Sequence, residues 1–293
     1  MAKKVAKFRV RLKTRGFLQA AERTARAADV LGQSFARALS SVLRDTERRL
    51  VPLVKDAAEG SPTAIIKAAQ ANDLRKQLRD TLRASGYDDL ADMATSNRLD
   101  TLVWSVLDRR KLARLSAAMN PRVEGRIAAL KALMHLDLLD EGDRAAKALW
   151  TAVTRGIFGS RPADAILIDL SRVIDRTAPQ IETLYDTSIS VFGRQVEALQ
   201  AGHDQATKFA FVGPVDDRIR PFCRRHVGHV YTREQIDALD NQQLDNVLLT
   251  GGGYNCRHVW QEISRFSELY NYGHEQRIPE VSTDLKQLAE RAA

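Results

Sequence analysis

Cysteine and aromatic residues are scarce in this chain of 293 residues, which contains two cysteines and 6% Phe, Trp and Tyr. Two cysteines cannot build a disulfide-rich scaffold, so we expect the chain to fold in a reducing compartment around an apolar core. No apolar run approaches the roughly 20 residues of a membrane-spanning helix, so no membrane partner is expected. The basic N-terminal segment MAKKVAKFRVRLKTRGF has no apolar stretch behind it, so we expect no export signal.

The motifs of the common cofactor enzymes are also missing. The sequence contains no glycine-rich dinucleotide fingerprint, phosphate-binding loop, paired-histidine zinc-protease motif or calcium-binding loop. Its 44% apolar and 28% charged composition is that of an ordinary soluble protein. At 293 residues the chain is long enough for one large or two medium domains. The lack of these cofactor motifs favours a protein without catalytic activity.

Positive charge is concentrated near the N-terminus. Residues 1–55 contain 14 Lys and Arg against 4 Asp and Glu, a balance of +10, whereas the remaining residues contain 31 against 33. A basic segment of this kind suits contact with nucleic acid or with an acidic protein surface, although a solvated helix face would have the same composition. The candidate contact residues are Lys3, Lys4, Lys7, Arg9, Arg11, Lys13 and Arg15.

Apolar residues recur with the period of an α-helix over about the first 200 residues. We expect one helix to end at Gly60, a second to end at Gly86 and a third to close near Pro121. Four shorter helices are expected beyond them, two within residues 126–158 on either side of LLDEGD, and one each at residues 164–175 and 179–201. Their apolar stripes are interpreted as core.

The pattern changes near residue 203. KFAFVGPV, which starts at Lys208, has the alternation of a strand followed by a Gly-Pro stop. TREQIDALD predicts a helix with Thr232 as N-cap and Gln235 completing a capping box. The predicted fold is therefore mainly α, an extended helical body followed by a small α+β C-terminal module. Its segments are a basic N-terminal helical arm (1–55), a helical body (56–203), the α+β module (204–275) and a C-terminal tail (276–293), either a short helix or frayed.

Both cysteines and three of the six histidines lie in two short segments of the module, residues 213–229 and 251–260. Zinc favours thiolate and imidazole ligands. One structural zinc is therefore predicted, with ligands drawn from Cys223, Cys256 and one or two of His226, His229 and His258. Three alternatives stay open: the cysteines pack as small apolar residues, they form a disulfide outside the cytoplasm, or Cys223 is a nucleophile activated by His226.

The first of these segments also contains a charged turn, DDRIRP. Its two aspartates and two arginines are expected to pair across the turn, where an aspartate can also cap backbone N–H groups. These residues are Asp216, Asp217, Arg218 and Arg220, and Pro221 then directs the exit of the chain. We interpret the turn as a polar clasp that holds two loops together. The alternative is that the two aspartates bind a divalent ion for nuclease chemistry.

These residues, in this order, resemble a known family. A long helix and a short strand, then a motif of Asp, two Arg, Pro and Cys, a glycine, and finally Asn-Cys-Arg-His with an aromatic residue, resemble the phage minor head protein family, typified by the F protein of phage Mu. The resemblance covers about residues 178–263, and His258 stands where the family commonly has a cysteine. The matching residues are Asp217, Arg218, Arg220, Pro221, Cys223, Gly228, Asn255, Cys256, Arg257 and His258, preceded by Tyr185, Gly193 and the strand FAFVGPV.

The resemblance implies a structural virion protein of a tailed phage, present in low copy number inside the head near the portal. Such proteins act in head assembly and in DNA packaging or delivery, without a defined catalytic activity. The implied partners are portal and capsid-interior proteins, and assembly takes place in the cytoplasm of the bacterial host. The charge of the basic arm fits this, because such an arm suits contact either with packaged DNA or with an acidic portal surface. Two alternatives are kept. One is a metal-dependent nuclease or thiol effector carried in the head, and the other is a DNA-binding protein without sequence preference.

Overall fold

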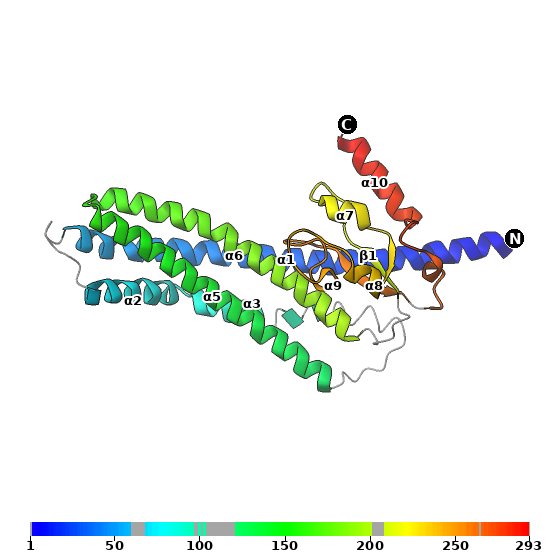
Figure 1. Cartoon of the computed structure of the whole chain (residues 1–293), viewed down its shortest axis with the longest axis horizontal. Coiled ribbons are helices and arrows are strands. Elements are labelled where there is room, and N and C mark those ends of the chain that lie inside the picture. Colours follow the sequence, from blue (N-terminus) through cyan, green and yellow to red (C-terminus); the bar gives the residue numbers. More distant parts are fainter. Residues whose placement is uncertain are drawn as a thin grey trace. The chain divides into compact units, whose positions relative to one another are not determined.

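The computed structural model describes residues 2–59, 68–96, 99–100, 102–103, 121–200, 208–263 and 265–292. In these ranges the fold is mainly α with a small three-stranded antiparallel sheet near the C-terminus, as predicted (Figure 1). The longer helices before the sheet are α1 (Ala2–Glu59), α2 (Ala68–Ala84), α3 (Tyr87–Thr95), α5 (Pro121–Phe158) and α6 (Ala163–Gln200). None of the described helices combines the length and the apolar character needed to cross a bilayer.

Two of these helices continue where the sequence predicted breaks. In α5, the LLDEGD segment stays helical, and Gly142 within it makes room for the ring of Tyr87, which would lie 2.3 Å from a Cβ at that position. The Tyr87 hydroxyl donates a hydrogen bond to the carbonyl of Leu138 (2.8 Å). This glycine therefore serves helix packing rather than termination, and the prediction of two helices in residues 126–158 is wrong.

α6 likewise continues through Pro179. A proline inside a helix costs roughly 3 kcal/mol because it removes one backbone hydrogen bond. Ile174 and Ile181, on either side of the proline, are both buried, and their burial favours an uninterrupted helix. The predicted division between residues 175 and 179 is therefore wrong. By contrast, α1 ends at Glu59 and Gly86 follows α2, as expected. The third expected helix, near Pro121, lies mostly outside the described residues.

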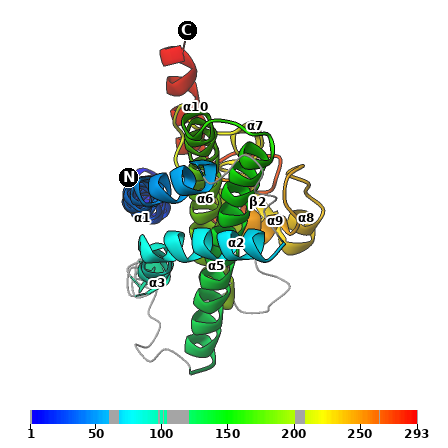
Figure 2. The same cartoon turned by 90° about the vertical axis from the view of Figure 1, so that its left-hand side faces the viewer.

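The chain forms two compact units, each assembled from separate stretches of sequence. One unit comprises residues 31–98 and 129–185, and the other comprises residues 1–30, 99–128 and 186–293. In the first unit, Phe35 of α1 stacks on Tyr185 of α6, with ring centroids 3.9 Å apart. The Tyr185 hydroxyl donates to the carbonyl of Ala94. The helices of this unit can be followed by their labels in Figures 1 and 2.

The second unit contains the small sheet, in the order β2-β1-β3. β1 (Lys208–Val212) lies between β2 (Val230–Thr232) and β3 (Val259–Ile263), and both pairings are antiparallel. The remaining elements of this unit are α7 (Pro221–His226), α8 (Arg233–Asp237), α9 (Val247–Thr250), the 3-10 helix η1 (Glu268–Asn271) and α10 (Pro279–Ala292). The capping box of Thr232 and Gln235 at the start of α8 is present as predicted.

The core of this second unit also includes segments that the sequence assigned elsewhere. Ala21 of α1 and Ile278, Val281 and Leu288 around α10 are buried in the same apolar cluster as β1. The expected tail is therefore an ordered helix that packs on the module. Within the sheet, Phe211 of β1 contacts Trp260 of β3, with ring centroids 4.4 Å apart. We use the term module below for the part of this unit from Lys208 to Ala292.

Candidate metal centre

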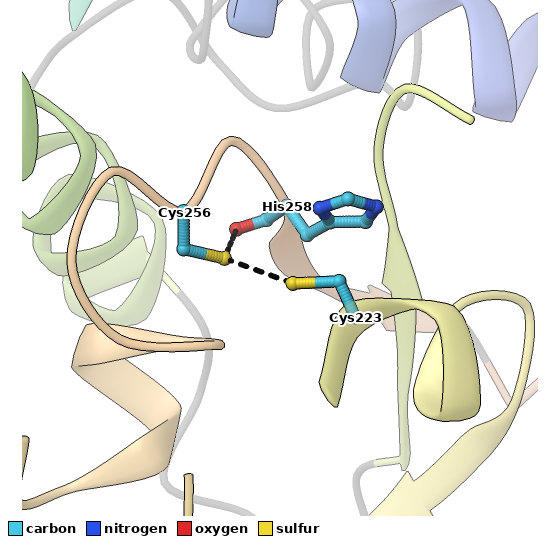
Figure 3. A group of neighbouring side chains, drawn as sticks. All are labelled: Cys223, Cys256 and His258. Carbon is cyan, nitrogen blue, oxygen red and sulfur yellow. Dashed lines mark hydrogen bonds between the residues drawn. The ribbon is translucent and has the colours of Figure 1, made fainter. Parts of the chain in front are cut away.

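The two cysteines of the chain lie side by side in the module. Pro221 starts α7, and this short helix turns Cys223 into the core, while Cys256 lies in the loop before β3. Their sulfur atoms are 3.6 Å apart, and both residues are only 1% exposed (Figure 3). The sulfurs are unlinked. The prediction that the two distant segments are brought together at their cysteines is confirmed.

His258 completes a group of three potential metal ligands. One of its ring nitrogens and the sulfurs of Cys223 and Cys256 all lie within 4.8 Å of one another. The residue is 2% exposed, and its ring stacks on that of Phe211 with centroids 5.2 Å apart. Its Nε2 atom is buried and has no hydrogen-bond partner among the described residues. Two soft thiols and an imidazole fit a zinc ion, because these are the ligands that zinc prefers.

The glycine-rich stretch before Cys256 gives the centre its space. A Cβ at Gly252 would lie 2.4 Å from the Cys223 sulfur, so only glycine fits there without displacing the sulfur. The Gly252 N–H donates a hydrogen bond to the Cys256 sulfur (3.0 Å). Such a donor stabilises negative charge on a sulfur atom. Gly251 and Gly252 are therefore fitted to the two cysteines.

The surroundings shift the pKa values of the two thiols in opposite directions. The hydrogen bond to Cys256, together with burial, raises the pKa of the Cys223 thiol. Burial also opposes ionisation of Cys256, but the hydrogen bond from Cys223 and the positive charge of Arg194 outweigh it and lower the pKa of Cys256. The surroundings of Cys256 therefore favour its thiolate form, the form of a cysteine that binds metal.

The other two candidate ligands lie apart from this group. His226 has its Nδ1 atom 2.7 Å from the Tyr231 hydroxyl. The ring of His229 lies near the same Tyr231 ring, with ring centroids 6.5 Å apart. Burial, followed by the positive charge of Arg225, lowers the pKa of His226 to about 4. The structure therefore selects His258 as the histidine that accompanies the cysteines. It also gives no support to His226 as a base for Cys223, because its Nδ1 contacts Tyr231.

The polar clasp is present, but its partners differ from those predicted. Asp216 accepts two hydrogen bonds from Arg257, at 2.7 and 2.5 Å, and a third from the backbone N–H of Arg218, at 3.1 Å. Arg218 pairs instead with Asp29 of α1 (3.0 Å), and Arg220 donates to the carbonyl of Tyr254. The expected pairing within the turn is wrong because longer-range partners are within reach of both arginines.

The same geometry bears on the nuclease alternative. The carboxylate of Asp216 is occupied by Arg257, whose hydrogen bonds hold the pKa of Asp216 below its usual range. Asp217 is exposed and is absent from the metal-ligand group found among the described residues. The two aspartates therefore do not form a paired carboxylate site in the described part of the chain.

The remaining residues of the motif make backbone contacts within the module and to α6. Gly228 donates its N–H to the carbonyl of Phe211 and accepts a hydrogen bond from the N–H of Ile278, which ties β1 to the start of α10. Asn255 has a positive φ of 54° and donates its N–H to the hydroxyl of Thr187 in α6 (3.1 Å). Both residues make hydrogen bonds to segments distant in the sequence.

The seven basic candidates from Lys3 to Arg15 lie in α1, but their side chains are outside the described part of the chain. Arg194 of α6 adjoins the centre and was not predicted from the sequence. It is 3% exposed and donates to the carbonyls of Leu249, Cys256 and His258. The available signal was a charged residue between Phe192 and Val196 on an apolar helix face.

Comparison of the chain with protein-family models, with curated proteins and with solved structures yields no significant match.

Proposed function

We propose that the chain is a structural protein of a tailed-phage head, a minor head protein inside the capsid near the portal that acts in assembly and DNA packaging or delivery. The observation that carries the proposal is the behaviour of the motif residues. Cys223, Cys256 and His258 are 2% exposed or less and close on one another, and Asp216 and Arg257 join the same two segments by an ion pair. A motif of this kind holds loops together. Its cysteines and histidine are buried, so a substrate in solution would not reach them.

The metal part of the proposal is one structural zinc held by Cys223, Cys256 and His258. When bound, the zinc would cross-link α7 to the loop before β3 by coordination. A module with a three-stranded sheet and short helices has a limited core, so such a cross-link would contribute directly to its folding free energy. The closeness of the two sulfurs and the His258 ring, and the lowered pKa of Cys256, favour this role.

The proposed partners follow from the positive charge of the N-terminal segment. The N-terminal segment has a charge balance of +10 over residues 1–55, and α1 presents it as one continuous helix. A basic helix suits an acidic face of the portal or the capsid interior, and it also suits packaged DNA through phosphate contacts that do not depend on sequence. The helical body would then provide the docking surface, and the module would keep the C-terminal part compact.

The test is to locate the chain in particles of the phage or prophage that encodes it. Procapsids and DNA-filled heads are purified by density gradient, and the chain is quantified against the portal protein by mass spectrometry. We expect a few copies per head, in a constant ratio to portal, protected from added protease until the heads are opened. Absence from both particles, or complete digestion in intact heads, would overturn the proposal. The major capsid protein is the control for particle recovery and integrity.

A further inference from the structure

Arg194 holds the loop that carries two of the three ligands. From α6 its Nε donates to the carbonyl of His258 (2.9 Å) and its Nη1 to the carbonyl of Leu249 (3.0 Å), while Nη2 donates to the carbonyl of Cys256. All four residues belong to the same compact unit. The planar guanidinium fork therefore sets the positions of both ligand residues relative to each other.

No described carboxylate pairs with this buried guanidinium, although burying an unpaired charge is costly. The sulfur of Cys256 lies close to this guanidinium and becomes negatively charged when the thiol ionises. Nη2 of Arg194 and Sγ of Cys256 both lie 3.0 Å from the position that a Cβ of Gly251 would occupy. A thiolate that ligates a metal carries the negative charge that offsets the charge of Arg194. The buried arginine is thus explained by the centre it adjoins.

A second contact from the same helix supports this reading. Thr187 lies seven residues before Arg194, so the two side chains share one face of α6, two turns apart. The Thr187 hydroxyl accepts the N–H of Asn255, directly before Cys256 in the chain. The ligand loop is therefore attached to α6 at two points, through Thr187 and through Arg194.

We propose that Arg194 is the positioning residue of the metal centre, and that metal occupancy and the attachment of the ligand loop to α6 depend on each other. The inference rests on the metal part of the proposed function. Arg194 lies outside the set of residues that could ligate the metal, so its effect is exerted through the backbones of Cys256 and His258. Outer residues that orient metal ligands typically change metal affinity by about 10- to 100-fold when replaced.

The experiment measures zinc affinity of the full-length protein by competition with a chromogenic chelator. Arg194→Gln is expected to weaken zinc binding about 10- to 100-fold. Arg194→Lys, which keeps the charge but loses the fork, is expected to weaken it by a smaller factor. Arg277→Gln is the matched control, because Arg277 also donates to backbone carbonyls of the module, those of Arg224 and Arg225, but to neither ligand. It should bind zinc as the wild type does.

A second readout separates positioning from general stability. Hydrogen exchange of residues 186–196 is followed with zinc and after its removal by EDTA. In the wild type, removal should speed exchange in this part of α6, and in Arg194→Lys exchange should already be fast with zinc present. Wild-type affinity in both Arg194 variants, or an equal loss in Arg277→Gln, would overturn the assignment of Arg194 alone. A wild type that binds no zinc would overturn this inference and the metal centre, while the location in heads stays open to its own test.

Discussion

Arg257 and Asp216 form a bidentate ion pair across 41 residues of sequence, with both nitrogen–oxygen distances between 2.5 and 2.7 Å. Arg257 lies between the two candidate ligands Cys256 and His258, and Asp216 lies in the turn before α7. The pair therefore joins the same two segments as the cysteines do, independently of any metal. Asp29 of α1, which is 3.9 Å from Arg257, adds a third segment to this group of charges.

Replacing Asp216 by asparagine should destabilise the protein by about 1–2 kcal/mol, because the Arg257 guanidinium is 11% exposed and would lose its carboxylate. Urea unfolding followed by circular dichroism measures the change. Asp217→Asn is the control, since this neighbouring carboxylate is exposed and should leave the unfolding midpoint unchanged. The hydrogen bond from Arg257 lowers the pKa of Asp216, so the difference between Asp216→Asn and wild type should vanish as the pH falls below about 3.8. Equal effects of the two variants would argue against the clasp.

Cys223→Ser, Cys256→Ser and His258→Ala should each reduce the zinc content from one per chain to near zero, measured by elemental analysis of protein purified under reducing conditions. His226→Ala and His229→Ala should retain the metal, because neither histidine belongs to the group of ligands within 4.8 Å. Removal of zinc by a chelator should lower the melting temperature of the wild type. Loss of zinc in the two control variants, with retention in His258→Ala, would assign the third ligand elsewhere.

The stability of metal-free protein should fall as the pH is lowered from about 6.5 towards 4. Burial, followed by the charge of Arg225, lowers the pKa of His226 to about 4, whereas the unfolded chain takes up this proton near pH 6.5. Because the unfolded state binds more protons in this window, its free energy falls relative to the native state. Since His226 is only half-buried, we expect a loss of about 1 kcal/mol after allowance for solvent screening.

His226→Gln should remove the part of this pH dependence that comes from His226, because glutamine does not titrate in the window. The part that comes from His229, whose pKa burial also lowers, should stay. Thermal or urea unfolding at pH 4.5 and pH 7 measures the difference. If the free energy of unfolding of the variant fell with pH as much as that of the wild type, His226 would not be a group that titrates in this window.

The basic arm should bind DNA in a manner that weakens steeply with salt. Lys3→Gln combined with Lys4→Gln should reduce the slope of log affinity against log salt by up to about 2, since each phosphate contact contributes roughly 0.9. Arg75→Gln combined with Lys76→Gln, on α2, is the control of equal charge change. Gel shifts at several salt concentrations measure both. Identical slopes for the two double variants would mean that the arm makes no DNA contact and would favour an acidic protein surface as its partner.

Local chemistry made part of this molecule predictable. The strand from Lys208 and the capping box at Thr232 depend on neighbouring residues, so both were predicted correctly. The approach of Cys223 and Cys256 was also predicted, because few other reasons place both cysteines of a chain in two polar loops. In each case the deciding interaction is either local or specific to a rare residue type.

The features that escaped prediction depend on partners far away in the sequence. From the sequence alone, Gly142 indicates the end of a helix. In the structure it leaves space for the ring of Tyr87, which lies 55 residues earlier in the chain. Arg218 was expected to pair within its own turn, but Asp29 is 189 residues away and closer in space. Arg194 lies in a helix, where an arginine is normally solvated. Its role follows only from the backbone carbonyls of the folded loop that accept its hydrogen bonds.

The core shared by Ala21 and the strand β1 has a consequence for how the chain reaches its native state. Contacts such as the one between Asp29 and Arg218 close a loop of 189 residues, a class of contact that slows folding far more than it reduces final stability. A cut in the intervening segment would turn this closure into an encounter between two molecules, governed by their concentration. A chain nicked between residues 59 and 68 should therefore stay assembled once folded, yet recover poorly after dilution from denaturant.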